Sequence, residues 1–218
     1  MDIVYIRGGD KHAVEIAAAA GMLYGIRHDY IAYAKVHMLD IRWTRYDWRE
    51  YLARVRDLRP VVALAPDYEH AWQWTGLQRQ IDDLRPLVDH IMVCPKWHGA
   101  VAHIPADCIV AVSVPARTYA GFLPSFSALV GRRVHLLGGN LDRQTRLISA
   151  YNSAGASVVS LDTDQMALKG GHGQWLSEGK WRQVRCNSVP DHELALASAI
   201  AMVKRLQFAA TQKQGYFE

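Results

Sequence analysis

Residues 133–162 read RVHLLGGNLDRQTRLISAYNSAGASVVSLD, and this stretch indicates how the chain folds. Two short apolar runs, 134–137 and 157–161, flank an amphipathic segment at 143–154. Gly155 follows that segment, and glycine is the residue that most often ends a helix. The pattern predicts a strand, a helix and a second strand in one unit.

The same alternation recurs along the whole chain. Strand-like runs occur at 3–6, 36–41, 61–65, 90–94, 109–114, 134–137 and 157–161. Helices are predicted at 12–22, 48–58, 77–87, 143–154 and 191–208. Because the strands are apolar throughout, both faces of the sheet should be covered and the strands mostly parallel. We expect one α/β domain over 1–218, a (β/α)8-type TIM-like barrel with about seven readable strands, and keep an open doubly wound sheet as the alternative.

The composition argues against a disordered, a membrane-spanning and a metal-binding protein. A hydrophobic content of 50% argues against a disordered chain, and the longest apolar runs fall short of a bilayer span. The three cysteines form no C-x-x-C pair and the histidines no H-x-x-x-H pair, so no metal site is expected. These features predict a cytoplasmic protein without a membrane partner. The net charge of +4 mildly favours an anionic partner.

Polar residues follow the predicted strands, whereas the residues that precede the strands show no comparable set of polar side chains. In either fold the carboxyl ends of the strands share one rim, where ligands bind. Asp40, Asp67 and Asp162 each follow a strand, as do Lys96 and Ser113. Singly, each aspartate also suits a turn or a helix N-cap, but three of them together predict a site for acid–base or nucleophilic chemistry.

The glycine pair after the run at 134–137 has two interpretations. Gly138 and Gly139 would let backbone amides approach a phosphate or a flat base without a Cβ in the way. Alternatively, they form a tight turn in which Asn140 caps the next helix. Neither nucleotide-binding glycine motif is present. A Gly/Trp-rich segment at about 169–190 is predicted to be mobile, as a substrate-covering loop or a connector.

The stretch from 133 to 162, with its Gly-Gly strand end, helix and Asp162, resembles the late barrel strands of the tRNA-guanine transglycosylases. The resemblance implies that Asp162 is the nucleophile that attacks the ribose C1′. Asp67 then resembles the aspartate that recognises the purine edge. Asp40 takes the place of the second aspartate, which serves in proton transfer.

The chain also departs from those enzymes. It lacks their Cys-rich zinc subdomain and their Asp-Ser-Gly-Gly-Phe-Gln motif, and it is shorter. The resemblance therefore points to the compact phage and bacterial relatives that place 7-deazaguanines in DNA. It implies base exchange without a metal or redox cofactor. The implied partners are DNA or another nucleic acid and a 7-deazaguanine-type base. A homodimer is a separate alternative that the sequence leaves open.

Two other functions fit the same residues. One is a small-molecule enzyme that acts on a nucleoside or sugar phosphate with the same strand-end carboxylates. The other is a non-catalytic module that binds a nucleotide or a nucleic-acid strand. In the binding module, Gly138 and Gly139 and the loops rich in basic and aromatic residues would hold the ligand. For the base-exchange reaction, the predicted ligand-binding residues are Asp67, Lys96, Ser113, Gly138, Gly139 and Asn140, beside the catalytic candidates Asp40 and Asp162.

Overall fold

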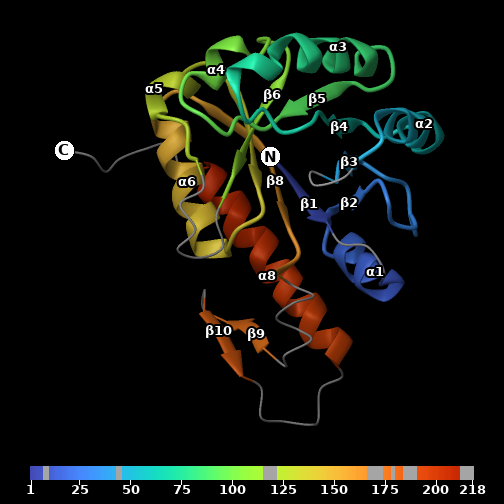
Figure 1. Cartoon of the computed structure of the whole chain (residues 1–218). Coiled ribbons are helices and arrows are strands. Elements are labelled where there is room, and N and C mark those ends of the chain that lie inside the picture. Colours follow the sequence, from blue (N-terminus) through green and yellow to red (C-terminus); the bar gives the residue numbers. More distant parts are fainter. Residues whose placement is uncertain are drawn as a thin grey trace.

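The computed structural model describes residues 1–6, 10–42, 46–114, 122–165, 174–177, 180–183 and 191–211. Eight parallel strands form a closed barrel in chain order, and β8 pairs with β1 to close it (Figure 1). The strands are β1 (Asp2–Ile6), β2 (Leu23–Arg27), β3 (Met38–Asp40), β4 (Val62–Leu64), β5 (His90–Val93), β6 (Ile109–Ser113), β7 (Arg133–Leu137) and β8 (Ser157–Thr163). The predicted (β/α)8 barrel is confirmed, and the open sheet is wrong.

Helices connect most of the strands around the barrel. They are α1 (Lys11–Ala19), α2 (Trp48–Leu58), η1 (Ala71–Gln73), α3 (Trp74–Leu84), α4 (Ala100–His103), α5 (Phe126–Leu129), α6 (Leu141–Ser153) and α8 (Asp191–Thr211). The helix predicted at 48–58 is confirmed residue for residue, because Asp47 caps it and Tyr51, Leu52 and Val55 form its buried stripe. The helix predicted at 77–87 begins three residues earlier and ends three earlier, at Trp74 and Leu84.

The strand missing from the prediction is β2. It contains Gly25, which weakens the strand signal, and no helix separates it from β3. The glycine has a packing reason, since a Cβ at this position would lie 2.7 Å from Cγ1 of Val4 on β1. With β2 in place, all eight strands of the predicted (β/α)8 barrel are accounted for.

The end of the described chain packs against the outside of the barrel. Helix α8 contacts α6 and α1, and it carries the antiparallel hairpin of β9 (Gln174–Ser177) and β10 (Lys180–Gln183) (Figure 1). Buried Leu176 donates its backbone N–H to the Ser198 hydroxyl of α8 over 3.1 Å. The segment predicted to be mobile at 169–190 lies largely outside the described residues.

One helix passes the length and composition test for a membrane span. Residues Glu193–Thr211 of α8 have a mean hydropathy of 1.2, although polar and charged side chains interrupt the apolar run. One face of this helix packs against the protein, where Ala199, Met202 and Leu206 are inaccessible to solvent. Only 33% of the apolar window is buried, and Phe208 is 64% exposed.

Candidate active site

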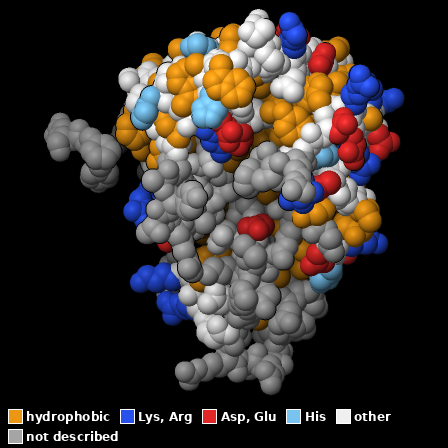
Figure 2. All heavy atoms as spheres, viewed as in Figure 1, with side chains coloured by type: hydrophobic (Ala, Val, Ile, Leu, Met, Phe, Trp, Pro, Cys, Tyr) orange, Lys and Arg blue, Asp and Glu red, His pale blue; other side chains and the backbone are white. Residues whose placement is uncertain are grey.

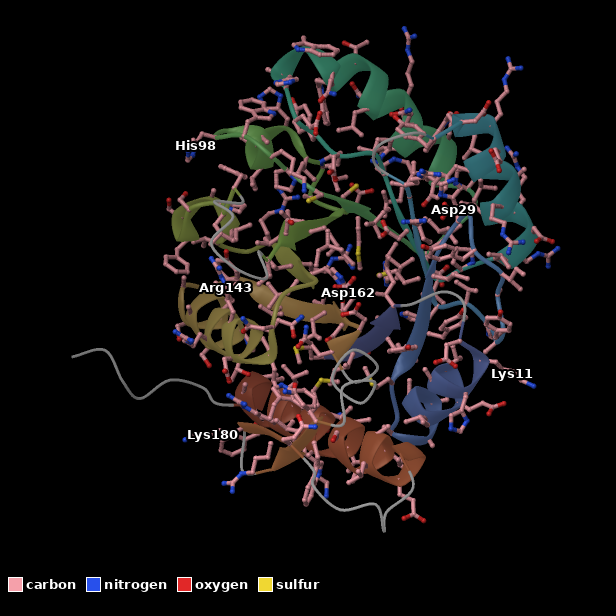
Figure 3. All side chains as sticks on the ribbon, turned by 60° about the horizontal axis from the view of Figure 1, so that its bottom comes forward. Lys11, Asp29, His98, Arg143, Asp162 and Lys180 are labelled. Atoms are coloured by element: carbon pink, nitrogen blue, oxygen red, sulfur yellow. The ribbon has the colours of Figure 1, made fainter. Side chains whose placement is uncertain are left out.

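A cavity of about 760 Å³ opens at the carboxyl ends of the strands. Its lining residues are Asp40, Ile41, Leu64, Asp67, Glu69, His70, Lys96, Ser113, Val114, Leu137, Gly138 and Asp162. Six of the eight residues selected from the sequence are therefore brought together. Figure 3 shows Asp162 in the middle of the barrel. In Figure 2, the side chains of acidic residues, coloured red, are visible near the centre of the surface shown.

Asp162 lies on β8 and is 4% exposed. One carboxylate oxygen, Oδ1, accepts the backbone N–H of Gly138 at the end of β7. Burial raises the pKa of Asp162 to about 7, against this hydrogen bond, and the charge of Asp40 raises it further. A carboxyl group with this pKa exists in both protonation states near neutral pH, which suits a reacting group.

Asp40 is the last residue of β3. Its Oδ1 accepts the backbone N–H of Ile41 over 2.8 Å, and its own carbonyl accepts the N–H of His28. Burial raises the pKa of Asp40 to about 7, and the charge of Asp67 adds to the effect. The cavity thus holds two carboxyl groups that can each donate or accept a proton near neutrality.

Asp67 and Lys96 form an ion pair beside these carboxyls, with Nζ 3.3 Å from Oδ2. The chain continues β4 and β5 as a parallel pair beyond their ends, since Tyr68 N–H donates to Cys94 and Lys96 N–H donates to Tyr68. Burial raises the pKa of Asp67, and the lysine opposes this. Burial lowers the pKa of Lys96, but Cys94 and Asp67 outweigh it and the net pKa is raised. Lys96 therefore stays an ammonium.

The remaining two candidates from the sequence lie outside the lining. Asn140 is the N-cap of α6, where its side chain accepts the backbone N–H of Arg143 over 2.9 Å. Gly139 has φ of +89°, and a Cβ there would lie 2.4 Å from Cγ1 of Val114. Gly139 and Asn140 therefore form the tight turn and helix N-cap that were one of the two interpretations of this segment. Of the glycine pair, only Gly138 lines the cavity.

Gln144 was not selected from the sequence, yet it fixes the geometry of the site. This fully buried α6 side chain donates from Nε2 to the carbonyls of Gly138 and Asp162, over 2.8 and 2.7 Å. It thus holds the ends of β7 and β8 at a fixed separation. Its sequence signal is weak, because a glutamine four residues after an N-cap looks like an exposed helix residue.

Replacing Gln144 with leucine should lower the free energy of unfolding by about 1–3 kcal/mol, because the buried carbonyl of Asp162 and the part-buried carbonyl of Gly138 lose their donor. Urea unfolding followed by circular dichroism measures the effect. Gln78→Leu, on the exposed face of α3, is the matched control and should change stability by no more than about 0.5 kcal/mol. Equal stability of the two variants would remove Gln144 from this role.

Glu69 and His70 also line the cavity and were not selected as site residues. Both follow Asp67 in the strand-end segment, so the strand-end rule would have found them if it had been extended by three residues. Gln73 Oε1 accepts both of their backbone N–H groups, over 2.8 and 2.9 Å. In the part of the chain that the structure describes, no group of three His, Cys, Asp or Glu side chains could hold a metal ion.

The fold and the cavity define a (β/α)8-barrel protein with a carboxylate-rich pocket at the carboxyl ends of its strands. Residues 17–207 match a protein family described as "Family of unknown function (DUF6610)", and the chain belongs to that family. A search of curated proteins gives no match. Among solved structures, the chain is similar to a putative fructose-1,6-biphosphate aldolase from Coccidioides immitis. The two share 11% identity over 97% of this chain and 92% of that one, with a TM-score of 0.61. At this identity the likeness concerns the fold alone.

Proposed function

We propose that the protein is a base-exchanging transglycosylase that replaces guanine in DNA with a 7-deazaguanine derivative. The observation that carries the proposal is the convergence of Asp162, Asp40 and the Asp67–Lys96 pair on one cavity. Glycosyl transfer through a covalent intermediate needs two carboxyl groups of different roles at one sugar. A polar pair beside them supplies an acceptor and a donor for the edge of a base.

In the first step the ionised carboxylate of Asp162 forms a bond to C1′ through an oxocarbenium-like transition state. The bond between C1′ and the guanine nitrogen breaks, and the departing base takes a proton from the Asp40 carboxyl. In the second step the incoming base attacks C1′, displaces Asp162 and returns a proton to Asp40. Protons and electrons balance over the cycle.

The charge state of Lys96 favours carboxylate chemistry over amine chemistry. An amine nucleophile that forms a Schiff base must lose its proton, and such lysines have lowered pKa values. The pKa of Lys96 is raised instead, and its ammonium is paired with Asp67. The ion pair with Asp67 therefore favours the ammonium form of Lys96 in the free protein. The choice of DNA and of a 7-deazaguanine rests on the sequence resemblance and the net charge of +4.

Mass analysis of nucleosides from the DNA of cells that express the protein tests the proposal. Cells supplied with a 7-deazaguanine base should contain the corresponding deoxynucleoside when they express the native chain and lack it when they express Asp162→Asn. Unmodified DNA in both, together with turnover of a free nucleoside by the purified protein, would favour a small-molecule enzyme. Nucleic-acid binding that survives neutralisation of Asp40, Asp67 and Asp162 without any turnover would favour a binding module.

A further inference from the structure

His135 of β7 is the most deeply buried titratable side chain next to Asp162, and the proposed reaction does not use it. The residue is 0% exposed, and burial lowers the pKa of its imidazole to about 3. It is therefore neutral at physiological pH, and its contact with Asp162 is not an ion pair. Nε2 has no hydrogen-bond partner within the described residues, which is rare for a buried polar atom.

An irregularity in the barrel brings Ser160 opposite His135. Val134 pairs with Val158, but His135 pairs with Ser160, so β8 carries an extra residue at this point. The Ser160 hydroxyl then lies 2.7 Å from Nδ1 of His135. Since side chains alternate along a strand, Ser160 and Asp162 point to the same side of β8. Serine, imidazole and carboxylate thus lie in sequence within the barrel.

The other ring nitrogen of His135 is directed at the proposed nucleophile. Nε2 lies 4.0 Å from Oδ1 of Asp162, the oxygen that also accepts the Gly138 N–H. That distance exceeds a hydrogen bond, and a neutral ring at this distance interacts with a carboxylate as a dipole. A neutral imidazole carries its proton on one nitrogen only. If the proton were on Nδ1, the Nε2 lone pair would face an anionic oxygen and repel it.

We infer that His135, oriented by a hydrogen bond donated from Ser160 to Nδ1, presents Nε2–H to ionised Asp162 and so keeps the anionic form of the nucleophile accessible. His135 is thereby a positioning residue, since it acts on the reaction through Asp162. The catalytic consequence rests on the proposed function. The tautomer and the effect on Asp162 do not, because they concern the free protein.

Other charged groups also face this row of side chains. Asp40 and Asp164 both raise the pKa of Asp162, and neither changes in the variants below. On the other side, Ser160 lines a second cavity of about 210 Å³ at the amino ends of the strands. The titratable or charged residues of that cavity are Asp2, His37, His90 and Arg133. None of these residues changes in the variants below.

Two NMR measurements on the full chain without substrate test the inference. Ring-nitrogen shifts of His135, recorded above the titration of Asp162, should show a bare Nδ1 and a protonated Nε2. Carboxyl-carbon shifts of Asp162 give its titration midpoint. His135→Leu should raise that midpoint by about one pH unit, because the carboxylate loses its N–H dipole. His135→Gln, which restores an N–H at a similar reach, should restore most of the shift.

A second pair of variants keeps the test independent of how His135→Leu folds. Ser160→Thr retains the hydroxyl and should match the native midpoint, whereas Ser160→Ala should move the midpoint in the direction of His135→Leu. A protonated Nδ1 with a bare Nε2 beside ionised Asp162 would overturn the inference. So would equal midpoints in Ser160→Ala and Ser160→Thr. Failure of base exchange would leave all of these readings unchanged.

Discussion

Replacement of Asp162 with asparagine is expected to abolish any covalent protein–DNA adduct and to slow base exchange by at least about 10³-fold. The amide has nearly the shape of the carboxyl and can still accept the Gly138 N–H, but it cannot displace a base from C1′. The measurement is a single-turnover reaction with a labelled oligonucleotide, separated on a denaturing gel. The adduct should accumulate when the incoming base is withheld from the native protein.

A carboxylate on the outside of the barrel provides the control. Asp57 lies on α2, where it pairs with Arg54 and its side chain is 67% exposed. Asp57→Asn should form the adduct at the native rate. Adduct formation by Asp162→Asn at that same rate would show that another group is the nucleophile. Thermal melting of both variants verifies that each is folded.

The carboxyls of buried Asp162 and partly buried Asp40 should make the protein lose stability as the pH rises from about 4 to about 7. Each has a pKa near 7 in the folded chain against an ordinary value of 3.8, so the unfolded state ionises first. Their contribution is therefore complete below pH 4 and lost as the pH passes 7. Because one pKa unit corresponds to about 1.4 kcal/mol, each carboxyl accounts for at most about 4 kcal/mol.

Urea unfolding of the native chain and of the double variant Asp40→Asn/Asp162→Asn at several pH values measures this effect. The double variant should exceed the native chain in stability at pH 8, and the difference should shrink or reverse near pH 4. Asp57→Asn should follow the native curve throughout. A constant difference between the double variant and the native chain across this range would mean that the two carboxyls do not titrate near neutrality.

Much of the candidate site follows from a rule about strand ends. Parallel strands bring their carboxyl ends to one rim, so Asp40, Asp67 and Asp162 share a cavity although they lie far apart in the chain. Lys96 was found in the same way. From the sequence, the rule cannot distinguish a residue whose side chain faces the cavity from a neighbouring residue that only forms the turn. Asn140 was selected for this reason, although its side chain caps α6.

Sequence patterns did not identify the residues that support the site without lining the cavity. Gln144 lies on a helix and His135 in the middle of a strand, and both look like ordinary helix or core residues. Their importance depends on which atoms they meet. Gln144 meets two carbonyls at the ends of β7 and β8, and His135 meets Ser160 and Asp162.

The sequence alone determined the alternation of strands and helices, seven of the eight strands, and the acidic character of one rim, because these depend on local periodicity and turn chemistry. Closure of the barrel and the register of β8 were decided only by the tertiary structure. Gly25 became a strand residue because β1 and β3 pair with its strand on both sides. The extra residue in β8 aligned Ser160 with His135 because strands in a closed barrel must adjust to a shared stagger, which no local pattern specifies.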